Sequence, residues 1–132
     1  MTANASSEYG DLWKAANAVD GKTECGTTDV AITNFQINPW LKVNLYNTST
    51  VDRVLIYNRQ DCCGGRLHDV SVSVIDNGRN VSCGFYPGPA ASENRILFLC
   101  EKETNGNGVT ISILSRNGQN DSLSVCKVEI YG

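Results

Sequence analysis

The chain has 132 residues, with 11 Lys and Arg against 14 Asp and Glu, so its formal net charge is -3. This length predicts one domain spanning residues 1–132, and the mild acidity offers no basic surface for nucleic acid. Because no apolar run is long enough to span a bilayer, we expect no membrane insertion.

Residues 11–19 (DLWKAANAV) are the first segment with a regular pattern, and they predict one or two helical turns. From residue 40 onward the pattern has period two, as in half-buried strands. The expected strands are residues 40–46, 52–58, 68–76, 95–100, 108–115 and 124–132. Turn-forming residues separate them at 76–78, 86–89, 105–108 and 117–118. The pattern predicts an all-β antiparallel sandwich or barrel with long N-terminal loops.

The cysteine content indicates an oxidising environment. The six cysteines are Cys25, Cys62, Cys63, Cys83, Cys100 and Cys126. A zinc site is disfavoured because the chain has no C-x-x-C pair and a single histidine. The even number favours disulfides, although the residues alone leave the pairing open. Glycosylation sequons at Asn4, Asn47, Asn80 and Asn120 also suggest an extracellular protein. Since the N-terminus lacks a signal peptide, we expect a segment of a longer secreted precursor.

Catalytic patterns are scarce. His68 is the only imidazole, and its position at the start of an expected strand favours a structural role over a catalytic one. No glycine-rich phosphate loop occurs. A carboxylate pair for sugar hydrolysis remains an open alternative, because folding could bring together Asp61, Asp69 and Asp76. We expect no enzyme.

Residues 58–69 (NRQDCCGGRLHD) hold the most distinctive chemistry. A disulfide between the adjacent Cys62 and Cys63 would present a rigid apolar plate at a loop tip. Arg59 and Arg66 carry planar donor forks suited to oxygen acceptors, and Asp61 could hold them in place. A sugar fits this combination, because its C–H face can pack on the plate while its hydroxyls meet the arginines. The competing interpretation, an ion pair beside two unrelated cystines, is equally compatible with these residues alone.

The run RQDCCGGR resembles the sugar-binding signature of F-type lectins (fucolectins). That signature is a histidine, 26 intervening residues, Arg-x-Asp, four residues, and Arg or Lys, together with a disulfide between adjacent cysteines. The segments AANAVDGK, NPWLKVNL and CKVEIYG extend the similarity over nearly the whole chain. The resemblance implies a discoidin-like β-sandwich jelly roll. It also implies three disulfides, Cys62–Cys63, Cys83–Cys100 and Cys25–Cys126.

Two departures from the family concern the ligands. Ile32 stands where the family histidine helps to hold an axial sugar hydroxyl, so one polar contact is lost. Family members commonly bind a structural calcium, and Asn17 and Asp20 match that loop. However, Lys22 and Lys127 stand at expected ligand positions, and an ammonium reverses the local charge. We therefore expect no required cofactor, with calcium left as an open alternative.

The resemblance implies a secreted, non-catalytic lectin domain that recognises fucose or a related terminal sugar on glycoproteins or cell surfaces. Arg59 and Arg66 would donate to sugar hydroxyls, Asp61 would orient them, and Cys62–Cys63 would form the stacking plate. The alternative is a protein-interaction or adhesion module, for example in gamete recognition, on the same fold with altered or lost fucose binding. Ile32 favours this alternative.

Overall fold

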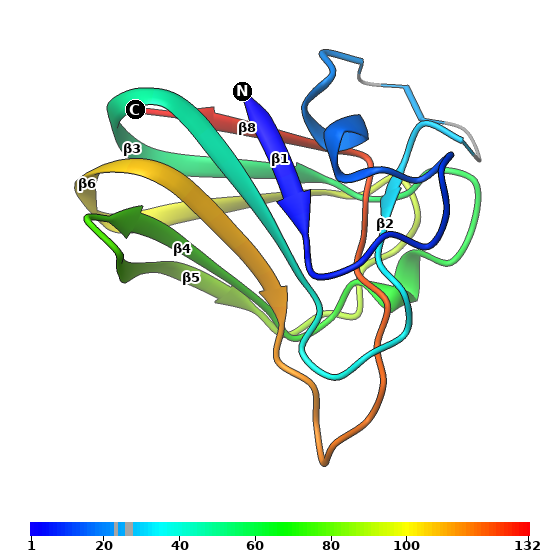
Figure 1. Ribbon diagram of the computed structural model, residues 1–132. Coiled ribbons are helices and arrows are strands. Elements are labelled where there is room, and N and C mark those ends of the chain that lie inside the picture. The colour runs from blue at the N-terminus through cyan, green and yellow to red at the C-terminus, as the bar shows by residue number, and fades with distance from the viewer. Residues whose placement is uncertain (23, 26–27) are drawn as a thin grey trace.

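The computed structural model describes residues 1–22, 24–25 and 28–132, and its regular structure is almost entirely β (Figure 1). The strands are β1 (Thr2–Ala5), β2 (Ala31–Ile32), β3 (Trp40–Tyr57), β4 (Val70–Asp76), β5 (Arg79–Tyr86), β6 (Arg95–Ile113), β7 (Ser124–Val125) and β8 (Lys127–Tyr131). Two short 3-10 helices complete the fold, η1 (Ala15–Val19) and η2 (Gly64–Arg66). Helix η1 occupies part of the segment expected to be helical. All strand pairs are antiparallel, as expected.

The two long strands, β3 and β6, connect the two layers of the sandwich. The first part of β3 (residues 40–44) pairs with β1 and with residues 108–112 of β6. The last part of β3 (residues 53–57) pairs with β8 and with residues 95–99 of β6. Strands β4 and β5 extend the first layer beyond β6. Figure 1 shows both long strands curving from one layer into the other, which closes the sandwich at that end.

Three expectations about local structure need correction. Residues 105–108 were expected to form a turn but lie inside β6. Their glycines serve close packing, since a Cβ at Gly106 would lie 2.5 Å from the carbonyl oxygen of Ile75. Strands β1 and β5 were not expected, because neither segment has a clear apolar alternation. By contrast, the turn between β4 and β5 forms at Asn77 and Gly78, both with positive φ, as the Asn-Gly pair predicts.

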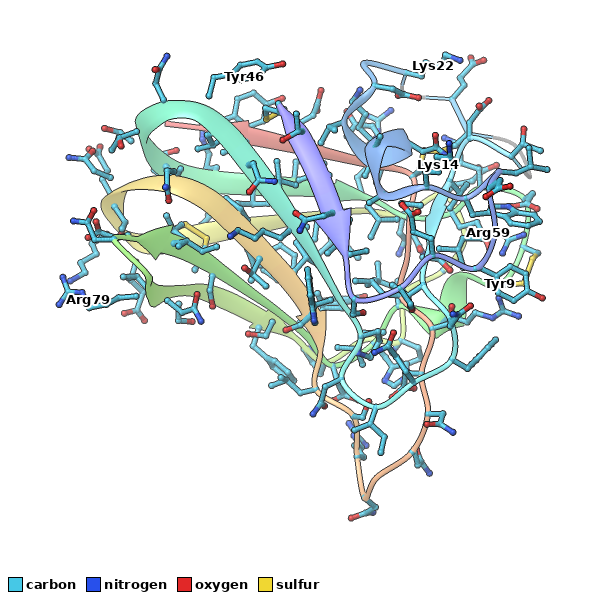
Figure 2. All side chains as sticks on the ribbon, in the orientation of Figure 1. Tyr9, Lys14, Lys22, Tyr46, Arg59 and Arg79 are labelled. Atoms are coloured by element: carbon cyan, nitrogen blue, oxygen red, sulfur yellow. A yellow bond between two sulfur atoms is a disulfide. The ribbon has the colours of Figure 1, made fainter. Side chains whose placement is uncertain are left out.

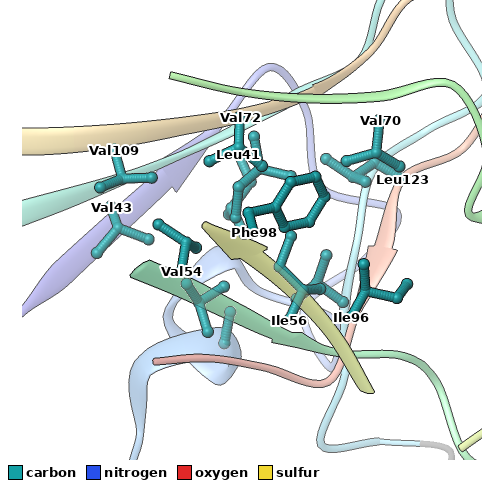
Figure 3. Packing of buried hydrophobic residues seen from close by; sticks show 14 of the residues in the cluster. Leu41, Val43, Val54, Ile56, Val70, Val72, Ile96, Phe98, Val109 and Leu123 are labelled. Atoms are coloured by element: carbon teal, nitrogen blue, oxygen red, sulfur yellow. The ribbon is translucent and has the colours of Figure 1, made fainter. Parts of the chain in front are cut away.

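The core lies between the layers and consists mainly of inward-facing aliphatic side chains (Figure 3). Its fully buried members include Leu41, Val43, Val54, Ile56, Val72, Val109, Ile111 and Val128. Alternation along each strand places these residues inside, which is why the period-two pattern identified the strands. The core therefore provides a rigid base for the loops at its two ends.

Three disulfides join loops and strands. Cys83–Cys100 links β5 to β6, and Cys25–Cys126 ties the N-terminal loop to the segment between β7 and β8. Cys62–Cys63 lies in the loop after β3. These are the three pairs that the resemblance implies. The Cys25–Cys126 disulfide holds the N-terminal loop against the end of the sandwich where the loop after β3 emerges.

Candidate functional site

The loop after β3 is anchored by the buried side chain of Asn58. Its amide nitrogen donates to the carbonyl oxygens of Gly64, at 3.1 Å, and Ala91, at 2.9 Å. Its side-chain oxygen accepts from the backbone N–H of Arg59. Gly64 packs tightly in this arrangement, because a Cβ there would lie 2.2 Å from the backbone nitrogen of Ser92. The loop is thus fixed at both ends.

Cys62 and Cys63 form the tip of this loop. Their Cα atoms are 3.7 Å apart, and both residues are half-buried. Cys63 has a φ of 63°, a left-handed conformation that is uncommon for a residue with a side chain. The surrounding loop imposes this conformation, and the disulfide presents an apolar sulfur surface to the adjoining cavity.

Arg59 and Asp61 form a bidentate ion pair across the same loop. Nε of Arg59 donates to Oδ1 of Asp61 at 2.7 Å, and Nη2 donates to Oδ2 at 3.1 Å. The hydrogen bond from Arg59 holds the pKa of the Asp61 carboxyl below its usual value, although partial burial opposes this shift. The pair fixes the guanidinium plane of Arg59, whose side chain is only 12% exposed.

Arg66 approaches the same cavity from the end of η2. Its guanidinium carbon lies 5.1 Å from the centre of the Phe35 ring, in a cation–π contact. No side-chain acceptor for this guanidinium is found among the described residues. Its N–H donors are therefore available to a ligand.

These side chains surround one cavity of about 250 Å³. Its lining residues are Tyr9, Trp13, Ile32, Phe35, Arg59, Cys62, Cys63 and Arg66. Figure 2 shows Tyr9 and Arg59 at the same end of the molecule, opposite Tyr46 and Arg79. Of the sugar-binding residues predicted from the sequence, Asp61 alone does not line this cavity. It borders a larger, open polar groove on the other side of the loop and acts on the cavity through Arg59.

The aromatic part of the wall was missed by sequence reasoning. Tyr9 and Trp13 lie edge to face with ring centres 5.3 Å apart, and Phe35 supports Arg66. All three come from the segment before β3, in which Trp13 belongs to the expected helical turns, and Tyr9 and Phe35 to expected loops. Aromatic residues are about as frequent in this segment as in the rest of the chain, so no local signal marked them. Their position relative to residues 59–66 depends on the tertiary fold.

Ile32 holds a central position in this wall. Its N–H donates to the carbonyl oxygen of Trp13 at 3.2 Å, and its own carbonyl accepts from the N–H of Tyr9 at 2.8 Å. Its side chain is 5% exposed and packs in an apolar cluster beside the cavity. Ser124 is its partner across β2 and β7, and the buried hydroxyl of Ser124 has no hydrogen-bond partner among the described residues.

The residues considered for calcium make other contacts in the structure. The Asn17 side-chain nitrogen donates to the carbonyl oxygens of Leu12, Thr28 and Val30, so it occupies oxygens that could otherwise face a cation. Asp20 accepts from the N–H of Lys22. Lys127 is buried near the same region, directly after the Cys25–Cys126 link. Within residues 1–22, 24–25 and 28–132 no cluster of three or more His, Cys, Asp or Glu could hold a metal.

His68 lies outside the cavity and, contrary to expectation, outside the strands. Its two ring nitrogens lie 2.8 Å from Oδ2 of Asp69 and 2.9 Å from Oδ1 of Asp121. Asp69 also accepts from Arg116, and these partners hold the pKa of its carboxyl below the usual value, Arg116 having the larger effect. The cluster connects η2 to the long loop before β7 and is structural.

The comparisons with known proteins agree with this geometry. Residues 17–120 match the family described as the NedA-like, galactose-binding domain. The chain is 31% identical to Fucolectin-4 of Anguilla japonica over 136 aligned residues, covering 98% of this chain and 73% of the relative. None of the described helices is long and apolar enough to cross a membrane.

Solved structures of carbohydrate-binding domains also resemble this chain. A fucolectin from the serum of the striped bass, Morone saxatilis, superposes with a TM-score of 0.87 at 27% identity. The alignment covers 99% of this chain but 46% of the bass protein, so the chain spans about half of that lectin. A fucose-binding module of Streptococcus pneumoniae superposes with a TM-score of 0.84 at 25% identity, covering 98% of this chain and 89% of the module.

Proposed function

Because the chain belongs to the F-type lectin (fucolectin) family of discoidin-like carbohydrate-binding domains, we propose that its cavity binds fucose or a related terminal sugar. The relatives are lectins and carbohydrate-binding modules, so the protein is a non-catalytic carbohydrate-binding domain. We choose this site because Arg59, Arg66 and the Cys62–Cys63 disulfide all line one cavity.

Each group has a separate role in the proposed complex. Arg66 has donors available for sugar hydroxyls, while Arg59 keeps Nη1 available after pairing with Asp61. The sulfur surface of Cys62–Cys63 packs against the C–H face of the ring. A cavity of about 250 Å³ suits one sugar residue, because it lies below the typical range for drug-sized ligands, which is about 300–1,000 Å³.

The proposed ligands are fucosylated or related glycans on glycoproteins or cell surfaces, and the proposed location is extracellular. Three disulfides support an oxidising compartment. The four sequon asparagines, Asn4, Asn47, Asn80 and Asn120, are all exposed and so are accessible to glycosylation.

A glycan array with the parent protein, Arg66→Ala and Arg59→Lys tests the proposed site. We expect the parent to bind fucosylated glycans, Arg66→Ala to lose binding, and Arg59→Lys to bind much more weakly because a point charge cannot replace the fork. The matched control is Arg53→Lys, since Arg53 also pairs with a neighbouring carboxylate, that of Asp52, but lies away from the cavity. Fucose binding that survives both cavity substitutions would place the site elsewhere.

We further propose that binding and folding need no calcium. The support is the donor set around Asn17 and Asp20, with Lys22 and Lys127 nearby. A chelator should leave both the array signal and the melting temperature unchanged. A bound ion at 100 times its Kd would stabilise the fold by about 2.7 kcal/mol, so its removal would be visible as a lower melting temperature.

A protein-interaction or adhesion module on the same fold is the second candidate. It is favoured by the apolar Ile32 at the family histidine position and by the exposure of Tyr9 and Phe35, which are more than half exposed at the cavity. An array on which the intact parent binds no glycan would favour this candidate.

A further inference from the structure

The cavity has two walls of different character. The loop after β3 supplies Arg59, Cys62, Cys63 and Arg66, so both guanidiniums stand on one side. The segment before β3 supplies Tyr9, Trp13, Ile32 and Phe35, none of which is charged. A sugar that fits between them can direct hydroxyls to the arginines of the first wall, while the part of the sugar that faces Ile32 and Phe35 meets apolar side chains.

Ile32 is the aliphatic residue of the second wall. Both of its backbone hydrogen-bonding groups are already satisfied, by Trp13 and Tyr9. Its side chain packs with Cys25, Val30, Tyr57 and Cys126, so apolar groups lie behind it as well. A sugar hydroxyl directed at this point would lose water without gaining a partner from the Ile32 side chain, which disfavours binding.

We infer that the cavity selects deoxyhexoses in which the hydroxyl facing Ile32 is absent or carried as a methyl ether. This inference rests on the proposed function, since it specifies the sugar that the same cavity prefers. A hydrogen at that position removes the desolvation penalty. A methoxy group adds a methyl contact with an apolar side chain, and burial of one such group corresponds to about a fourfold gain in affinity.

The probes are L-fucose and its single deoxy and single O-methyl derivatives at carbons 2, 3 and 4. Titration calorimetry with the disulfide-intact protein should find at least one derivative that binds about fourfold more tightly than L-fucose. The same titrations with Ile32→Val and Ile32→Thr locate the effect, because Val and Thr have nearly the same shape and differ in polarity. The Val variant should keep the preference, and the Thr variant should lose or reverse it.

Melting curves establish that both variants are folded before they are compared. If the parent binds L-fucose more tightly than every derivative, the inference is wrong while the proposed function stands. A preference that is equal in the Val and Thr variants would also overturn it, since Ile32 would not be its cause. If neither L-fucose nor any derivative binds the parent, the proposed function itself fails, and the inference fails with it.

Discussion

The guanidinium of Arg66 lies over the ring of Phe35, with 5.1 Å between the guanidinium carbon and the ring centre. Phe35 belongs to the segment after β2, and Arg66 ends η2, so this contact joins the two walls of the cavity. The ring restricts the positions that the long Arg66 side chain can occupy. It therefore prepares the donors of Arg66 for a ligand, which reduces the ordering cost on binding.

Phe35→Leu should weaken sugar binding about two- to fivefold, because a cation–π contact at an exposed site contributes about 0.5–1 kcal/mol. The melting temperature should change little, since the Phe35 side chain is more than half exposed. Titration calorimetry and melting curves measure the two effects. Tyr131→Leu is the matched control, because Tyr131 contacts Arg53 at 5.3 Å in the same manner but does not line the cavity. Equal affinities for Phe35→Leu and the parent would show that the ring does not prepare Arg66.

Sugar binding should decrease at acid pH through Asp61. The carboxylate of Asp61 is stabilised by Arg59, which lowers its pKa in the folded protein. A carboxyl with a lowered pKa contributes stability above its unfolded pKa of about 3.9, and that contribution is lost as the pH falls through the folded value. Affinity controlled by this pair should therefore stay level from neutral pH to about pH 4, and fall only as the pH is lowered further toward the folded pKa of Asp61.

The Asp61→Asn variant tests whether Asp61 causes the loss of sugar affinity at acid pH. The variant should bind more weakly at neutral pH, because the neutral amide accepts from Arg59 less strongly. Its affinity should also vary less than that of the parent as the pH falls below about 4. Fluorescence titration across this range, within the folded region of each melting curve, measures both effects. If the affinity of Asp61→Asn falls at acid pH as steeply as that of the parent, the pH dependence belongs to another group.

The residues of the loop after β3 were predictable because they are close in sequence. Arg59, Asp61, Cys62, Cys63 and Arg66 all belong to one short loop, so their spacing alone brings them together. The strands were predictable for a similar reason, since alternation along a strand is a local pattern.

The opposite wall could not be derived in the same way. Tyr9 and Phe35 precede Arg59 by 50 and 24 positions and reach the loop only through the fold and the Cys25–Cys126 link. Asn58 was predicted to be the last residue of a strand. Its buried side-chain amide instead organises the loop by donating to the carbonyl oxygens of Gly64 and Ala91. Gly106 was predicted to lie in a turn, but its lack of a side chain permits two strands to approach closely. In each case the decisive contact is between segments that are far apart in sequence.

The disulfides should separate stability from binding. Replacing Cys62 and Cys63 together by Ser should abolish sugar binding with little loss of stability, because their link closes almost no loop. Replacing Cys25 and Cys126 together by Ser should lower the free energy of unfolding strongly. Those residues are separated by 101 positions, and the chain-entropy estimate for such a loop is about 4.7 kcal/mol.

Denaturant unfolding and calorimetry measure these two effects on the same preparations. Peptide mapping of the parent first establishes the pairing, and a link from Cys62 to any residue other than Cys63 would remove the sulfur plate from the mechanism. A Cys62 and Cys63 double variant that still binds the sugar fully would show that the plate contributes no affinity.

Ile32→His should strengthen the binding of unmodified L-fucose. An imidazole at this position can hydrogen-bond a sugar hydroxyl, and one such bond contributes about 0.5–1.5 kcal/mol, a gain of about two- to twelvefold. Ser124 faces residue 32 across β2 and β7, and its buried hydroxyl has no partner among the described residues. Side chains at opposed positions of antiparallel strands lie close enough to interact, so this hydroxyl can hold the second ring nitrogen.

The double variant Ile32→His with Ser124→Ala tests this arrangement by titration calorimetry. If Ser124 orients the imidazole, the double variant should lose most of the gain, while Ser124→Ala alone should bind as the parent does. The gain should be greatest for sugars with an axial hydroxyl at the recognised carbon, because hydrogen bonds are directional. If Ile32→His remains folded yet binds L-fucose no better than the parent, the histidine has been buried without a partner. The cavity has then been reshaped around an apolar group, and restoring the family residue alone does not restore the family contact.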